Sequence, residues 1–222
     1  MRGSSSLPGG AWPIPLIAFA GVWEAVARLV QRPSLFPTFV ETVSSLPSLF
    51  TAAMGWATLS SLVSAVISFT AAAVLAMAIG ALLKQSTGSQ SGSRIFIWLA
   101  IVFLSLSLTK LSFEGFGSGS NAVYVVGGGA SFLLMAALLS SGLSGMVVLD
   151  IGLLVAWAGV LSAESVVGGQ SLGVLVHSAS QDATPERFYA LCLVSALLGL
   201  VLVTVVESLA GRLNLMKGSG RR

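Results

Sequence analysis

Charged side chains are scarce in this sequence. Lys, Arg, Asp and Glu make up 9% of its 222 residues, while 55% of the residues are hydrophobic. Soluble domains carry about 25% charged residues, so a soluble fold is excluded and the lipid bilayer is the expected partner. The net charge of +3 comes from a few residues at the ends of apolar runs and in the tail. A positive-inside bias explains this charge, and no nucleic-acid partner is expected.

Cysteine and histidine each occur once. Cys192 has no partner for an intrachain disulfide, and metal sites that need several cysteines are excluded. A single histidine excludes sites that need two, and the sequence contains no Walker A loop, no GxSxG elbow and no HExxH motif. We therefore expect no enzyme, no metal site and no cofactor. His177 is expected at the membrane surface, with contact to a ligand or pigment as the alternative.

Apolar runs of about twenty residues predict membrane-spanning helices, because a helix satisfies its own backbone hydrogen bonds in lipid. The predicted fold is all-α, a single polytopic membrane domain over residues 1–222. A polar, glycine-containing segment is predicted to be re-entrant or interfacial at about 165–185, and the proline-rich stretch 31–50 to be a short interfacial element. Six spans are expected, at about 12–30, 56–83, 94–112, 121–141, 146–163 and 187–210.

Basic residues set the expected orientation. They gather at the amino end, in the loop after the second span and in the carboxyl tail, as Arg2, Lys84, Arg94 and Arg212 illustrate. The positive-inside rule then places both termini in the cytoplasm or the equivalent compartment. The short connection "SSGLSGMVVLD" at residues 140–150 falls on the same side.

Small residues recur at every fourth position of the second predicted span. Such a row forms a slanted groove on a helix, and a neighbouring membrane helix can approach closely along it. Chance is the alternative, because serine, alanine and glycine are frequent here. The row consists of Ser60, Ser64, Ser68, Ala72, Ala76 and Gly80.

Two acidic residues stand out near span ends. Glu164 is costly in lipid, and such a carboxylate is usually paired, capping or functional; the alternative is that it reaches headgroup water. Glu24 precedes Arg28 by one helical turn, in the order that favours an ion pair. The pairs of charged residues at span ends do not connect into a chain of ionisable groups across the bilayer, so no proton relay is predicted.

Residues 152–213 resemble the carboxyl end of permease subunits of ABC importers, especially the taurine, alkane sulfonate and nitrate group. The matching pattern is a span that ends in Trp157 and "SAE", followed by a glycine-rich turn to Ser171, Leu172 and Gly173, and then by an interfacial helix. Upstream, "GVWEAVARLV", "LFPTFVETVSSL" and "TLSSLVSAVISFTAAAVLAMAIGALLKQS" resemble earlier parts of the family in the same order.

The resemblance implies a permease-like fold that assembles with other membrane subunits, as a hetero- or homo-oligomer. It implies transport of a small anion, with ATP hydrolysis on a separate ATP-binding subunit. Trp157, Glu164 and Gly173 would lie near the outer gate.

The sequence departs from the family between the fourth and fifth spans. There the family carries an EAA-type loop that holds the ATP-binding subunit, whereas here only about four residues separate the apolar runs. A coupling helix needs about ten residues at 1.5 Å each. Three interpretations stay open: a permease subunit whose partner chain retains the loop, a non-transporting structural subunit of a larger photosynthetic or respiratory complex, and a small channel or pigment-holding protein with His177 as ligand.

Overall fold

The computed structural model describes residues 13–85, 120–140, 145–182 and 184–219, and every regular element in these ranges is a helix. The all-helical prediction is confirmed for this part of the chain. The predicted third span at 94–112 lies outside the described residues. The helices are α1 (Pro13–Val30), α2 (Phe39–Leu49), α3 (Ala52–Gln85), α6 (Ser120–Ser140), α7 (Gly145–Val167), α8 (Leu172–Gln181) and α9 (Pro185–Ser219).

Four of the described helices are long and apolar enough to cross a membrane. These segments are Ala52–Ile79, Asn121–Leu139, Gly145–Val167 and Pro185–Leu209, and they correspond to the second, fourth, fifth and sixth predicted spans. The protein is therefore a helical multi-pass membrane protein. The helix α1 covers the first predicted span with 18 residues, slightly fewer than the about 20 of a typical span.

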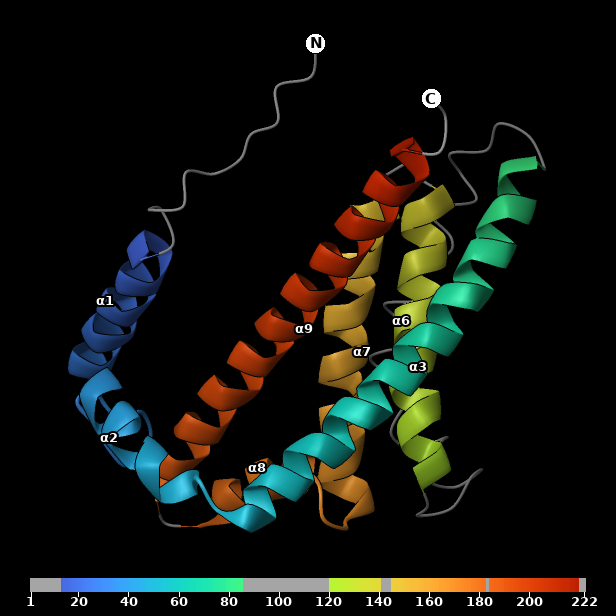
Figure 1. Ribbon diagram of the computed structural model, residues 1–222. Helices are drawn as coiled ribbons and strands as arrows, with labels where there is room; N and C mark the ends of the chain where they lie inside the picture. Colours follow the sequence, from blue (N-terminus) through green and yellow to red (C-terminus); the bar gives the residue numbers. More distant parts are fainter. Residues whose placement is uncertain (1–12, 86–119, 141–144, 183, 220–222) are drawn as a thin grey trace.

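The helices α3, α6 and α9 run towards the top of Figure 1, and α1 and α7 run in the opposite direction. The start of α1, the ends of α3 and α6, the start of α7 and the end of α9 lie at one end of the molecule, which is the top of Figure 1. The short helices α2 and α8 lie at the other end, which we call the α2/α8 end. An 11-residue helix such as α2 is about 16 Å long at 1.5 Å per residue, too short for a bilayer core of about 30 Å.

The centre of the molecule is a three-helix bundle of α3, α6 and α7 that packs through small residues. On α3 the buried positions recur every three or four residues and are mostly alanine or serine: Met54, Ala57, Ser61, Ala65, Ser68, Ala72, Ala73 and Ala76. Glycines on α6 and α7 face each other so closely that a Cβ on Gly159 would lie 2.9 Å from the Cα of Gly127. Close backbone approach of this kind is typical of membrane helices, which gain little hydrophobic free energy by associating.

The burial of the predicted row of small residues on α3 changes along the helix. Ser68, Ala72 and Ala76 are buried, the two alanines in a cluster with Met135 of α6. Ser64 is half-buried and Ser60 is exposed. Because an α-helix has 3.6 residues per turn, a strict four-residue row rotates away from a straight contact. The surroundings of Gly80, near the end of α3, lie outside the described side chains.

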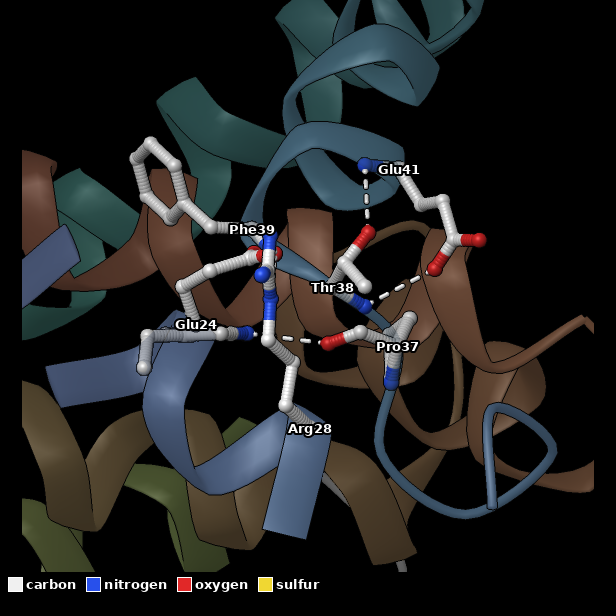
Figure 2. A network of polar contacts seen from close by, with 7 residues as sticks. Glu24, Arg28, Pro37, Thr38, Phe39 and Glu41 are labelled. Atoms are coloured by element: carbon white, nitrogen blue, oxygen red, sulfur yellow. Dashed lines mark hydrogen bonds and ion pairs between the residues drawn. The ribbon is translucent and has the colours of Figure 1, made fainter. Parts of the chain in front are cut away.

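An elbow joins α1 to α2 at the α2/α8 end. Gln31 ends α1 in the left-handed region at φ 52°, and its N–H donates to the Ala27 carbonyl oxygen at 3.1 Å. Thr38 then caps α2: its hydroxyl accepts from the Glu41 N–H at 3.2 Å, and its own N–H donates to the Glu41 carboxylate at 2.8 Å (Figure 2). This capping box satisfies two N–H groups at the start of α2.

Glu24 fixes the angle of the elbow. One carboxylate oxygen accepts from Arg28 Nε at 3.0 Å, which confirms the predicted pair, and the other accepts from the Phe39 N–H at 3.2 Å (Figure 2). The indole of Trp23 donates to the Pro37 carbonyl oxygen at 3.0 Å and packs edge-on against Tyr189 of α9. The first helix is thus attached to the rest of the chain at its carboxyl end.

Candidate functional site

The helix α8 starts directly after a tight glycine turn. Gly168 and Gly169 have φ of 83° and 105°, values that L-residues other than glycine rarely adopt. The turn ends α7 and reverses the chain, and Ser171 is the extended N-cap residue of α8. The helix lies within the segment 165–185 that was predicted to be interfacial.

A buried carboxylate meets the start of α8. Glu164, in the last turn of α7, is only 4% exposed. Its Oε2 accepts from the Ser61 hydroxyl of α3 at 2.6 Å and from the Gly173 N–H of α8 at 3.2 Å. Three helices therefore converge on one oxygen atom. We call Glu164, Ser61, Ser171, Leu172 and Gly173 the Glu164 junction.

Ser61 has a second role in the junction. Its hydroxyl oxygen accepts from the Leu172 N–H at 3.0 Å while the hydroxyl donates to Glu164. The N-cap residue Ser171 makes no capping hydrogen bond with its own side chain. The first N–H groups of α8 are thus satisfied by side chains of α3 and α7, instead of by the usual local cap.

Glycine is required at position 173. A Cβ there would overlap the Leu161 carbonyl oxygen and lie 2.6 Å from the Glu164 Cβ. Both neighbours belong to α7, and the carbonyl is backbone that cannot move aside without shifting the helix. The absence of a side chain at Gly173 lets the start of α8 lie directly against α7.

No cation offsets the charge of Glu164 within the described part of the chain, where the ion pairs are Arg28 with Glu24 and Arg187 with Asp182. An ionised Glu164 is instead stabilised by two donors and by the positive end of the α8 dipole. The Ser171 hydroxyl is buried and has no hydrogen-bond partner among the described residues. The described residues contain no group of three or more His, Cys, Asp or Glu suited to a metal ion.

Trp157 lies seven residues before Glu164 on α7 and faces α9. Its indole N–H donates to the Ser195 carbonyl oxygen at 2.9 Å, and the side chain is 4% exposed. Gly199 makes room for the ring, because a Cβ there would lie 3.0 Å from Trp157 Cδ1. Trp157 therefore ties α7 to α9, while Glu164 ties it to α3 and α8.

His177 takes no part in the contacts of Trp157 and Glu164 that join these helices. It is exposed on α8, and its Nε2 lies 3.1 Å from the side-chain nitrogen of Gln181 one turn later. Of the predicted site residues, the structure thus brings Glu164 and Gly173 into direct contact and places Trp157 and His177 elsewhere.

The sequence-based reasoning did not identify Ser61, and it named Ser171 as part of the matching pattern but not as a site residue. A usable signal was present for Ser61, because Ala57, Ser61 and Ala65 form a second row of small residues with the same spacing as the row from Ser60. Only the second row faces the bundle at this level. For Ser171, the glycine turn before it was visible, but its burial was not.

Comparisons of the chain with protein-family models, with curated proteins and with solved structures find no match.

Proposed function

We propose that this chain is a permease-like membrane subunit that acts as a structural component of a larger membrane complex. The observation that carries the proposal is the length of the connection between α6 and α7. α6 ends at Ser140 and α7 begins at Gly145, which leaves residues 141–144 to join them. A helix that docks into an ATP-binding subunit needs about ten residues. The connection between α6 and α7 is therefore too short to form a helix that would dock into an ATP-binding subunit.

The contacts of the candidate gate residues support the same conclusion. Trp157 is hydrogen-bonded to the α9 backbone, and Glu164 is hydrogen-bonded to α3 and α8. Both side chains are buried and hold neighbouring helices together. Buried side chains that hold helices together suit a structural subunit better than they suit the lining of a transport pathway.

The proposed orientation keeps the predicted one, with six spans and both termini on the cytoplasmic side. The start of α1 and the end of α9 lie at the same end of the molecule, as does the junction between α6 and α7 (Figure 1). The α2/α8 end then faces the outer side of the membrane.

A second candidate function is transport of a small anion, with this chain as one permease subunit of an ABC-type importer and a partner chain carrying the coupling loop. The contact between Glu164 and Gly173 favours it. The resemblance selects these residues from two separate segments, and their hydrogen bond of 3.2 Å joins those segments in space. ATP hydrolysis would then belong to another chain, and this chain would supply part of the pathway.

Photo-crosslinking in the native membrane distinguishes the structural subunit from the importer subunit. A crosslinking amino acid replaces Leu143, in the connection between α6 and α7, and the matched control carries it at Ser178, which is exposed on α8 at the other end. We expect adducts with lipid or with membrane subunits at position 143, and no ATP-binding subunit in the complex purified in mild detergent.

A stoichiometric ATP-binding subunit crosslinked at 143 but not at 178 would refute the structural proposal. ATP hydrolysis stimulated by a small anion in the purified complex, without that crosslink, would instead support the second candidate. Incorporation of the purified complex into vesicles then measures anion uptake directly.

A further inference from the structure

The start of α8 is held by side chains from other helices, which makes its position dependent on them. Leu172 and Gly173 donate their N–H groups to Ser61 and to Glu164. The first belongs to α3 and the second to α7. Because the N-cap side chain of Ser171 does not cap the helix, the loss of these acceptors would leave the first turn of α8 without hydrogen-bond partners in a buried place.

The turn before α8 is able to act as a pivot. A Cβ added to Gly168 or to Gly169 would meet nothing within 4 Å, so the turn is not packed against neighbouring elements. The glycines supply the backbone freedom that hinges use. At its other end, α8 ends at Gln181, and α9 begins at Pro185 after a connection of three residues.

We propose that the negative charge of Glu164 holds α8 against α3 and α7, and that protonation of Glu164 lets α8 swing outwards about Gly168 and Gly169. A proton from the outer aqueous phase adds to the carboxylate, and no other bond forms or breaks. The neutral acid accepts more weakly from the Ser61 hydroxyl and the Gly173 N–H. It also loses its attraction to the α8 dipole. This inference does not depend on the proposed function.

Few titratable groups share this part of the structure with Glu164. Between Ala52 and Ile79, α3 has no charged residue at all. None of the groups on the other helices forms an ion pair with Glu164 within the described residues. On the helices that pack against α7 and α8, and on α7 and α8 themselves, the titratable groups with described side chains are Tyr124 of α6, Asp150 of α7, His177 and Asp182 on and after α8, and Glu186, Arg187, Tyr189, Cys192 and Glu207 of α9.

Two cysteine positions on α8 measure whether the helix is docked. Ala179 is buried at 1% exposure, whereas its neighbour Ser178 is exposed. Each is replaced by cysteine in the full chain carrying Cys192→Ser, which removes the native thiol. The rate of labelling by a water-soluble maleimide is measured in detergent from about pH 5 to pH 8. The ratio of the two rates cancels the effect of pH on thiol reactivity, because below the pKa of both thiols the two thiolate fractions change by the same factor per pH unit.

We expect the Ala179→Cys to Ser178→Cys rate ratio to be low near pH 8 and to rise about tenfold as the pH falls. The tenfold figure corresponds to the difference between hydrogen bonds to a charged and to a neutral acceptor. With Glu164→Gln, the ratio should be high at every pH. Ser61→Ala removes the acceptor of the Leu172 N–H and should raise the ratio while keeping its pH dependence.

A ratio that changes with neither pH nor Glu164→Gln would overturn the proposal. So would a pH dependence that survives in Glu164→Gln, because His177 or an α9 group would then be responsible. If Glu164→Gln does not fold, the ratio in the native junction and the ratio in Ser61→Ala decide the matter, because both should depend on pH. A pH-independent ratio in both chains would then refute the role of the charge.

Discussion

The contact between α6 and α7 yields a quantitative prediction for Gly159→Ala. The added Cβ would lie 2.9 Å from the Cα of Gly127, whereas carbon atoms in contact prefer about 3.5–4.0 Å. The two helices must therefore separate by most of an ångström, because both atoms belong to or are attached to backbone. Overpacking of this kind costs about 1–3 kcal/mol. We expect a loss of about 2 kcal/mol in the free energy of unfolding.

Alanine substitutions at two other glycines should destabilise the protein to different degrees. Gly127→Ala meets a side-chain methyl of Val160 at 2.6 Å, and Gly152→Ala meets the flexible side chain of Met135. A methionine moves aside more easily than a β-branched residue on a helix. The loss of stability should thus be largest for Gly159→Ala and smallest for Gly152→Ala.

Gly55→Ala on α3 is the matched control. Its Cβ would meet nothing within 4 Å, so the better helix propensity of alanine should leave stability unchanged or raise it by up to about 1 kcal/mol. Thermal unfolding in detergent, followed by size-exclusion chromatography of a fluorescent fusion, measures the four variants together. At about 2–4 °C per kcal/mol for a chain of this size, Gly159→Ala should lower Tm by about 4–8 °C. An unchanged Tm for Gly159→Ala would show that α6 and α7 do not pack as closely as described.

Two further predictions concern single hydrogen bonds. Trp157→Phe removes the donor to the Ser195 carbonyl and should cost about 1 kcal/mol, or about 2–4 °C in Tm; no change would argue against the tie between α7 and α9. The Thr38 backbone N–H, with the Thr38 side chain, lowers the pKa of Glu41 below its ordinary value. The capping box therefore stabilises α2 fully above the pKa of the unfolded chain, about 4.3, and loses this contribution as the pH falls through the folded pKa. Amide-exchange protection at the start of α2 should fall there with native Glu41 and stay flat with Glu41→Gln, and equal profiles would contradict the assignment.

Much of the fold follows from the sequence through local rules. Long apolar runs with few charges predict spanning helices because lipid offers the backbone no hydrogen-bond partners. Thr38 followed three residues later by Glu41 is a helix-start signature that is readable without a structure. The glycine turn before Ser171 and the Glu24 and Arg28 pair are readable for the same reason, since each involves residues that are close in sequence.

The contacts between distant segments were not predictable in this way. The row of small residues from Ser60 was a reasonable pattern, but a row shifted by one residue has the same spacing and places Ser61 in the interior. Helical periodicity predicts that a helix has a face of small residues. Which of two adjacent rows is covered depends on how the neighbouring helices pack against it.

The sequence by itself determined that this protein is a helical membrane protein with short helices between its spans, because hydrophobicity, proline and capping residues act over a few positions. Tertiary structure alone decided that Glu164 meets Ser61 and Gly173, residues 103 and 9 positions away. A buried carboxylate needs partners, but the chain can supply them from any segment that folding brings within about 3 Å. That choice depends on how α3, α7 and α8 pack, and no local pattern encodes it.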